Sequence, residues 1–364
     1  MASKIGFDTK NYALYRGGIF SATYPMISGL IEDEPDRQFV AIGPPKGNEL
    51  FAQHKNVELQ EINLPIKHIY AGYLYNVTSF PLFSRLDELS VFYSPYFDLW
   101  TPKKVPTVIT IHDMVHYLLP QSYRKSLLVY IKFLLERSAK HAHKIITDSN
   151  VSKRDIMEIL GVQEEKITRI YCSINEDFLL PPTKSDFTQM LKARFGERCK
   201  ILYSAGAEHR KNLTKMFECL DLLPNDFMLI LTGKRESYQQ YFPDLESLEK
   251  QGKIFFPGYL QAQELIQIYQ NCDMVIFPSL FEGFGYPLVE AMAVKKPVVC
   301  SDIEIFREIG GDYPRYFDPH SIEEMKVAIM EARTEKIPDG FVFPEVYLAK
   351  NSKEQFKALF KEYI

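Results

Sequence analysis

The chain has 364 residues, of which 46% are hydrophobic, 25% charged and 13% aromatic. This composition is typical of a globular protein and excludes a disordered or fibrous class, and the length suits two domains of roughly 150 to 200 residues each. The formal net charge of −4 argues against non-specific binding to nucleic acid.

Cysteine usage and hydropathy predict a cytoplasmic protein. The five cysteines are scattered along the chain without a C-x-x-C pair, which disfavours a disulfide framework or a zinc site and fits a reducing cytosol. The N-terminal segment lacks the apolar core of a signal peptide, and no run approaches the ~18 to 20 apolar residues of a membrane span. Peripheral contact with a membrane surface is left open.

The first half of the chain alternates short apolar runs with amphipathic segments. Runs rich in Val, Ile and Phe between helical patterns are typical of βαβ units and a parallel sheet. The fold class is therefore α/β, and the strands expected in this half are 3–7, 37–43, 89–95, 106–113, 144–149 and 166–172.

The segment 124–144 between two of these strands is strongly basic and carries apolar residues at helical spacing. Two interpretations stay open. It is either a core-facing helix with a solvated basic side or a helix whose surface touches anionic lipid.

A break follows the first series of strands at Pro181 and Pro182, where regular structure stops and polar residues suit a linker. We expect an N-terminal Rossmann-like domain over 1–180, a C-terminal Rossmann-like domain over 183–340 and a terminal helix within 345–364. Ligands of such sheets bind at the carboxyl ends of the strands, in a cleft between the domains. The strands expected in the second domain are 199–207, 227–233, 253–258, 273–279 and 297–302.

The stretch EGFGYPLVE, residues 282–290, follows one of these strands. Its glycines let the backbone approach a ligand, and Pro287 is the expected first residue of a helix whose positive end attracts an anion, above all phosphate. Glu282 and Glu290, with seven residues between them, are expected to accept hydrogen bonds from hydroxyls on either side, as in a nucleotide sugar. The alternative is that Glu282 caps a turn and Glu290 only complements the helix dipole.

The same stretch, with AMAVKKPVV after it, resembles the E-x7-E motif of the retaining, nucleotide-sugar-dependent glycosyltransferases of family 4. That family has the GT-B fold, in which two Rossmann-like domains face each other across a cleft and a C-terminal helix packs back toward the first domain. The resemblance runs from the first strand to the final helix, and further segments that carry it in family order are 106–120, 144–170, 203–213 and 254–279.

The resemblance implies a role for each matched position. Glu290 would bind the ribose hydroxyls, and Glu282 would bind hydroxyls of the donor sugar near the reacting carbon. Arg210 and Lys211 would neutralise the pyrophosphate as it leaves. The loop between the glutamates would hold the sugar and the pyrophosphate through its backbone, at Gly283, Phe284, Gly285 and Tyr286.

Further positions follow from the same resemblance. His112 would face the sugar from the first domain, and Tyr259 and Leu260 would contact the base. Gly17 and Gly18 match a glycine-rich loop that faces phosphate or acceptor, although a glycine pair alone indicates only a flexible turn. The chain has no Asp-x-Asp pair, so we expect no metal and no cofactor.

These implications converge on a transferase that moves a hexose from a nucleotide sugar to a glycan or lipid-linked glycan. Mannose from GDP-mannose is favoured because family members with the Glu-x-Arg-Lys-Asn form are often mannosyltransferases. UDP-glucose and dTDP-rhamnose remain alternative donors. A catalytically silent nucleotide-sugar-binding subunit, a phosphorylase and an epimerase are alternative functions. Whether the chain forms a homodimer is left open.

Overall fold

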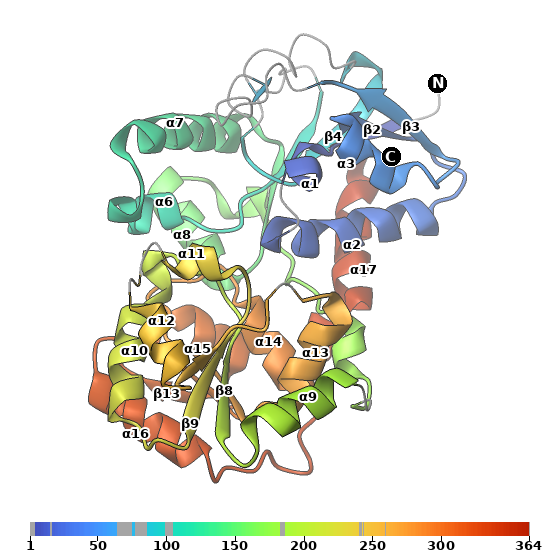
Figure 1. The fold of residues 1–364 in the computed structure, drawn as a ribbon. Coiled ribbons are helices and arrows are strands. Elements are labelled where there is room, and N and C mark those ends of the chain that lie inside the picture. The colour runs from blue at the N-terminus through green and yellow to red at the C-terminus, as the bar shows by residue number, and fades with distance from the viewer. Residues whose placement is uncertain are drawn as a thin grey trace. The chain divides into compact units, whose positions relative to one another are not determined.

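The computed structural model divides the chain into two compact units, one of residues 1–173 with 345–364 and one of residues 174–344 (Figure 1). The first boundary falls a few residues before Pro181 and Pro182. Each unit is an α/β body with a parallel sheet. The residues that the structure describes are 4–14, 17–63, 75–76, 86–98, 105–182, 186–239, 242, 244–258 and 260–363.

The first unit has a seven-stranded parallel sheet, flanked by helices that come from the crossover connections and from the end of the chain. The strands, in spatial order, are β3 (Val57–Glu61), β2 (Phe39–Gly43), β1 (Lys4–Asp8), β4 (Leu89–Ser94), β5 (Thr107–Thr110), β6 (Lys144–Thr147) and β7 (Ile167–Arg169). The helices described here are α1 (Lys10–Leu14), α2 (Gly18–Asp33), α3 (Pro45–Asn48), α6 (Val115–Leu118), α7 (Lys125–His141), α8 (Asn150–Leu160) and α17 (Ala349–Phe360).

Alternate residues of the central strands enter two different cores, because successive side chains of a strand point to opposite faces of the sheet. Ile146 lies in one core with Phe356 and Phe360 of the C-terminal helix α17. Its neighbour Ile145 lies in the other core with Leu135 of α7. The last helix of the chain thus packs on the first unit, beside α2 (Figure 1).

The second unit has a six-stranded parallel sheet. Its strands, in spatial order, are β10 (Ile254–Phe255), β9 (Phe227–Leu231), β8 (Cys199–Tyr203), β11 (Met274–Phe277), β12 (Val298–Ser301) and β13 (Arg315–Phe317). Its helices are α9 (Asp186–Phe195), α10 (Leu213–Leu222), α11 (Arg235–Gln239), α12 (Leu245–Lys250), α13 (Ala262–Asn271), α14 (Tyr286–Ala293), α15 (Glu304–Gly310) and α16 (Ile322–Ala332).

Both sheets wind outward from their first strand in the same order, with strand four of each unit pairing with strand one. This is the doubly wound order of a Rossmann fold, in which ligands bind where the winding reverses. The expected α/β class with two Rossmann-like domains is confirmed, and every predicted strand is present.

Two strands, β3 and β13, were not predicted. Both lie at the edge of a sheet. β3 reads VELQE and is mostly exposed, and β13 has only 3 residues. An edge strand needs no continuous apolar run, so the pattern that reveals a buried strand is missing.

Among the described residues, no helix is long and apolar enough to cross a bilayer.

Candidate active site

The residues expected to do chemistry in the second unit follow two neighbouring strands, β8 and β11. These strands pair in parallel, with Val275 opposite Leu202, and the winding of the sheet reverses between them. Their following loops are joined by a backbone hydrogen bond from Leu280 N–H to the Arg210 carbonyl, 2.8 Å long. The site therefore occupies the switch point of this sheet, where doubly wound folds bind ligands.

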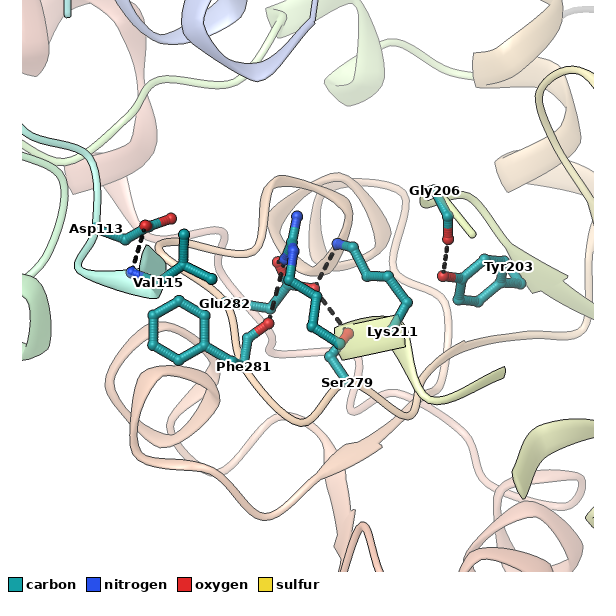
Figure 2. Close-up of polar contacts among 9 residues, drawn as sticks. Asp113, Val115, Tyr203, Gly206, Lys211, Ser279, Phe281 and Glu282 are labelled. Atoms are coloured by element: carbon teal, nitrogen blue, oxygen red, sulfur yellow. Dashed lines mark hydrogen bonds and ion pairs between the residues drawn. The ribbon is translucent and has the colours of Figure 1, made fainter. Parts of the chain in front are cut away.

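Glu282 is held by three side chains from these two loops (Figure 2). Lys211 Nζ lies 2.6 Å from Glu282 Oε1 and Arg210 Nη1 lies 2.9 Å from Oε2. Ser279 Oγ donates to Oε1 over 2.7 Å, and Arg210 also donates to the carbonyl of Phe281. Two cations and one hydroxyl therefore donate to the two oxygens of this carboxylate.

The electrostatics of this cluster, Arg210 with Lys211, Ser279 and Glu282, favour an anionic ligand. Burial alone would raise the pKa of Glu282, but Lys211 and Arg210 outweigh it and lower the pKa from 4.5 to about 2. Glu282 is thus ionised at neutral pH. With two cations and one carboxylate, the cluster carries one excess positive charge in a poorly solvated place, which attracts negative groups.

Lys211 is brought to Glu282 by a tight turn after β8. Residues His209–Lys211 form a 3-10 turn, and Asn212 follows with φ 56 before α10 begins. Asparagine tolerates this left-handed backbone better than most residues, and its side chain fixes the turn by donating to the carbonyl of Pro319 over 2.8 Å. The Lys211 side chain is only 9% exposed, so the turn directs a cation inward.

The loop after Glu282 leads into α14 through Gly285, which has φ 95. A Cβ at this position would lie 2.9 Å from Cε1 of Phe306, so both the conformation and the packing require glycine. The helix begins at Tyr286, with Pro287 second. It therefore starts one residue earlier than we predicted, and Glu290 lies in its second turn.

Glu290 has different surroundings from Glu282. Its Oε2 accepts a hydrogen bond from the Tyr269 hydroxyl over 2.7 Å, and Tyr269 is in turn bonded to the Ser204 hydroxyl. Burial raises the pKa of Glu290 from 4.5 to about 7, against a smaller lowering by the Tyr269 hydrogen bond. No ion pair of Glu290 with a described residue compensates for burial.

His112 belongs to the first unit, where it follows β5. Its Nδ1 lies 2.7 Å from Asp148 Oδ2 and its Nε2 lies 3.1 Å from the Pro95 carbonyl. The Pro95 carbonyl only accepts, so Nε2 donates to it, and a charged imidazole donates to Asp148 through Nδ1 as well. Burial lowers the pKa of His112, but Asp148 outweighs it and the net shift is upward. Asp113 instead accepts from the Val115 N–H over 2.9 Å (Figure 2).

The remaining predicted positions are less constrained. Gly17 precedes α2 and Gly18 is its first residue, and a Cβ at either would meet no described atom within 4 Å. Leu260 is half-buried just before α13, whereas Tyr259 lies outside the described residues. The structure thus brings Arg210, Lys211 and Glu282 into direct contact, with the loop to Glu290 beside them in sequence.

Three partners of these residues were not predicted. Ser279 is the last residue of the strand expected over 273–279, and Asp148 is the last but one of the strand expected over 144–149. The rule that functional residues lie at strand ends could therefore have found both. Tyr269 carries no such signal, because an aromatic residue on the buried side of an amphipathic helix reads as ordinary core. Among the described residues, no group of three or more His, Cys, Asp or Glu side chains could hold a metal ion.

Comparison with known proteins identifies the chain. A family model described as "Glycosyl transferases group 1" matches residues 189–339, and one described as "Glycosyltransferase Family 4" matches residues 44–178. O-antigen chain mannosyltransferase RfbU of Salmonella typhimurium is 30% identical over 255 residues, which cover 69% of this chain and 67% of RfbU. O-antigen chain mannosyltransferase B of Escherichia coli is 25% identical over 268 residues, covering 72% of this chain and 66% of that protein.

A solved structure extends the similarity in fold to nearly the whole chain. Anabaena Alr3699/HepE in complex with UDP-glucose superposes with a TM-score of 0.69 at 16% identity and 99% coverage of both chains. Fold, site and family models together define the class of a glycosyltransferase. The chain belongs to glycosyltransferase family 4 and is a nucleotide-sugar-dependent hexosyltransferase.

Proposed function

We propose that the chain is a retaining transferase that moves mannose from GDP-mannose to a hydroxyl of a glycan or lipid-linked glycan. The observation that carries the proposal is the cluster of Arg210, Lys211 and Glu282 with its excess positive charge at the switch point. The choice of mannose is supported by relatives named as O-antigen mannosyltransferases. A glycan acceptor and a role in polysaccharide assembly follow from the same names.

The cluster suits the departure of a nucleoside diphosphate. In the transfer, the bond from the anomeric carbon to the phosphate oxygen breaks, and its electron pair leaves with the diphosphate. The acceptor oxygen bonds to the same face of that carbon, and its proton passes to the leaving phosphate. Arg210 and Lys211 stabilise the negative charge that develops on the diphosphate, while the ionised Glu282 accepts hydrogen bonds from sugar hydroxyls.

Protein cations also make a metal clamp unnecessary in this proposal. Arg210 and Lys211 supply the charge that a divalent ion would otherwise bring to the diphosphate. Transfer is therefore expected to continue at an unchanged rate after the enzyme has been treated with EDTA. A loss of transfer that added Mg²⁺ or Mn²⁺ restores would refute metal independence.

The donor is tested by calorimetric titration with GDP-mannose, UDP-glucose, UDP-N-acetylglucosamine and dTDP-rhamnose. GDP-mannose is expected to bind most tightly and to lose affinity in Glu290→Ala. Tighter binding of another nucleotide sugar would overturn the donor assignment. In a transfer or donor-hydrolysis assay, Glu282→Ala is expected to abolish turnover. Turnover absent from the wild type as well, with donor binding intact, would indicate a silent subunit.

We also infer that α7 is the surface that approaches a lipid-linked acceptor. One side of this helix packs in the core, but Val129 and Phe133, one turn apart, are 72% and 53% exposed. Exposed Arg124, Lys125 and Lys140 accompany them. An apolar pair with cations fits an anionic lipid surface. Val129→Ser with Phe133→Ser should reduce cosedimentation with phosphatidylglycerol vesicles, whereas equal sedimentation of variant and wild type would refute the inference.

A further inference from the structure

Glu290 is connected to two hydroxyl groups that none of the roles above uses. Tyr269, on α13, is fully buried. Its hydroxyl lies 2.7 Å from Glu290 Oε2 and is bonded on its other side to Ser204, the first residue after β8. The chain Ser204, Tyr269, Glu290 therefore links three elements of the second unit through side-chain hydroxyls.

We propose that Ser204 and Tyr269 form a hydroxyl relay that presents one oxygen of Glu290 to the donor ribose and makes ribose binding depend on pH near neutrality. The proposal rests on the proposed function, because it takes the ligand of Glu290 to be the ribose of a nucleotide sugar. Tyr269 is a positioning residue in this scheme, since it acts through Glu290.

The direction of the hydrogen bonds follows from the chemistry of the three groups. An ionised carboxylate only accepts, so Tyr269 gives its single hydroxyl hydrogen to Glu290. Ser204 must then donate to the Tyr269 oxygen. When Glu290 takes up a proton on Oε2, it donates to Tyr269, and Tyr269 donates to Ser204. The relay therefore satisfies both protonation states without moving a side chain.

The relay also decides which oxygen is available. Oε2 is occupied by Tyr269, whereas no described residue donates to Oε1. Packing fixes the tyrosine that makes this choice, because its ring meets the Phe178 ring edge-on, with centroids 5.3 Å apart. An ionised Oε1 can accept a hydrogen bond from a ribose hydroxyl, and a charged acceptor binds hydroxyls more strongly than a neutral one.

Burial and the relay have opposite effects on the pKa of Glu290. Burial raises the pKa of Glu290 to about 7, and among the described residues only the Tyr269 hydrogen bond lowers it. The charged and titratable groups on the described elements around α14 make no contribution: Glu176 and Asp177 before α9, Glu264 on α13, Cys300 on β12, and Glu304, Arg307 and Glu308 on α15.

Tyr269→Phe tests the relay, because it removes the hydroxyl and keeps the ring that packs on Phe178. Glu290 should then lose the interaction that favours its ionised form, so its pKa should rise by about one pH unit. At pH 7 the affinity for GDP-mannose or UDP-glucose should fall about fivefold and recover toward the wild-type value at high pH. Ser204→Ala should produce a smaller shift in the same direction.

Two measurements separate the relay from the proposed function. Carbon-13 NMR of glutamate carboxyls, with the Glu290 signal assigned by Glu290→Gln, follows its titration without any ligand. Calorimetry with GDP-mannose and with UDP-glucose follows binding across the same pH range. Tyr313→Phe is the matched control, because it removes a tyrosine hydroxyl that donates to the Lys296 carbonyl and does not contact Glu290.

The expected result is that the Glu290 titration and the binding midpoint both move upward in Tyr269→Phe and stay in place in Tyr313→Phe. An unchanged Glu290 titration in both Tyr269→Phe and Ser204→Ala overturns the relay, even if a nucleotide sugar binds. A shifted titration with no binding of either nucleotide supports the relay and overturns the donor site. If Tyr269→Phe does not fold, the Ser204→Ala titration decides the question.

Discussion

Glu282 and Glu290 are separated by seven residues, yet their carboxyl groups have opposite electrostatic surroundings. Both are withdrawn from water, which raises the pKa of each. Two cations reverse this effect at Glu282 and lower its pKa to about 2. At Glu290 a single tyrosine hydroxyl offsets burial only in part, so its pKa is about 7. The difference lies in what the neighbouring strands and helices bring to each position.

One motif therefore holds two chemically different acids. Glu282 is a permanent anion whose partners, Lys211 and Arg210, are set by the loop after β8. Glu290 is an acid whose charge changes around neutral pH. Environments that separate the pKa values of two carboxyl groups give them separate roles. Under the proposed function, these are a fixed charge beside the reacting bond and a titratable group beside the ribose.

Replacing Glu282 by Gln should have the largest effect on stability. Lys211 and Arg210 would remain poorly solvated without their acid, so the free energy of unfolding at pH 7 should fall by about 3 kcal/mol. Because the pKa of Glu282 is lowered in the folded state, its stabilisation is complete above pH 4.5 and is lost as the pH falls toward 2. As the pH falls over this range, the free energy of unfolding measured with urea should therefore decrease less in the variant than in the wild type.

Ser279→Ala is the control for Glu282→Gln. It removes one hydrogen bond to Glu282 but keeps all three charges, and the expected loss is about 1 kcal/mol. If Glu282→Gln were no less stable than Ser279→Ala, the cluster would contribute nothing through its charges and the contrast between the two glutamates would disappear.

Glu290→Gln should have the opposite pH dependence. The pKa of Glu290 is raised in the folded state, so its stabilisation is complete below pH 4.5 and is lost as the pH rises through about 7. Glutamine stays neutral, and above pH 7 the variant should be more stable than the wild type by about 2 kcal/mol. Its affinity for the donor should nevertheless fall about tenfold, because the charged acceptor is missing.

The matched control for this variant is Glu236→Gln, which makes the same change in net charge at an exposed position on α11. It should leave both stability and donor affinity unchanged at every pH. A Glu290→Gln variant that lost stability above pH 7 would show that Glu290 is paired with a cation in solution.

The difference between the two glutamates could be predicted only in part from the sequence. Glu282 and its cations follow two mostly apolar, buried strands that are easy to recognise, so their meeting at the carboxyl edge of the sheet was predictable. The Tyr269 contact was not, because it depends on the rotation of α13 against α14. The edge strands β3 and β13 were missed for lack of a buried pattern, and the helix start was misplaced by one residue because Pro287 fits either of the first two positions.

Lys295 offers a smaller test at the far end of the helix that carries Glu290. Lys295 has φ 55, a left-handed backbone conformation that lysine rarely adopts. The N–H of Lys296 bonds to the Ala291 carbonyl over 3.0 Å and that of Lys295 to Met292 over 3.1 Å, which is the Schellman pattern that favours glycine. Lys295→Gly should therefore raise the free energy of unfolding by about 0.5 kcal/mol.

Lys296→Gly removes the same charge at a position without a positive φ and should lower stability by about 0.5 kcal/mol, since glycine only adds flexibility to the unfolded chain there. Neither variant should change the affinity for the donor, because neither alters Tyr269 or the carboxyl of Glu290. If donor affinity followed helix stability in this pair, the loss in Glu290→Gln would reflect the integrity of α14 rather than recognition by its carboxylate. If neither lysine variant changes donor affinity, the loss of affinity in Glu290→Gln is explained by the missing charge of Glu290.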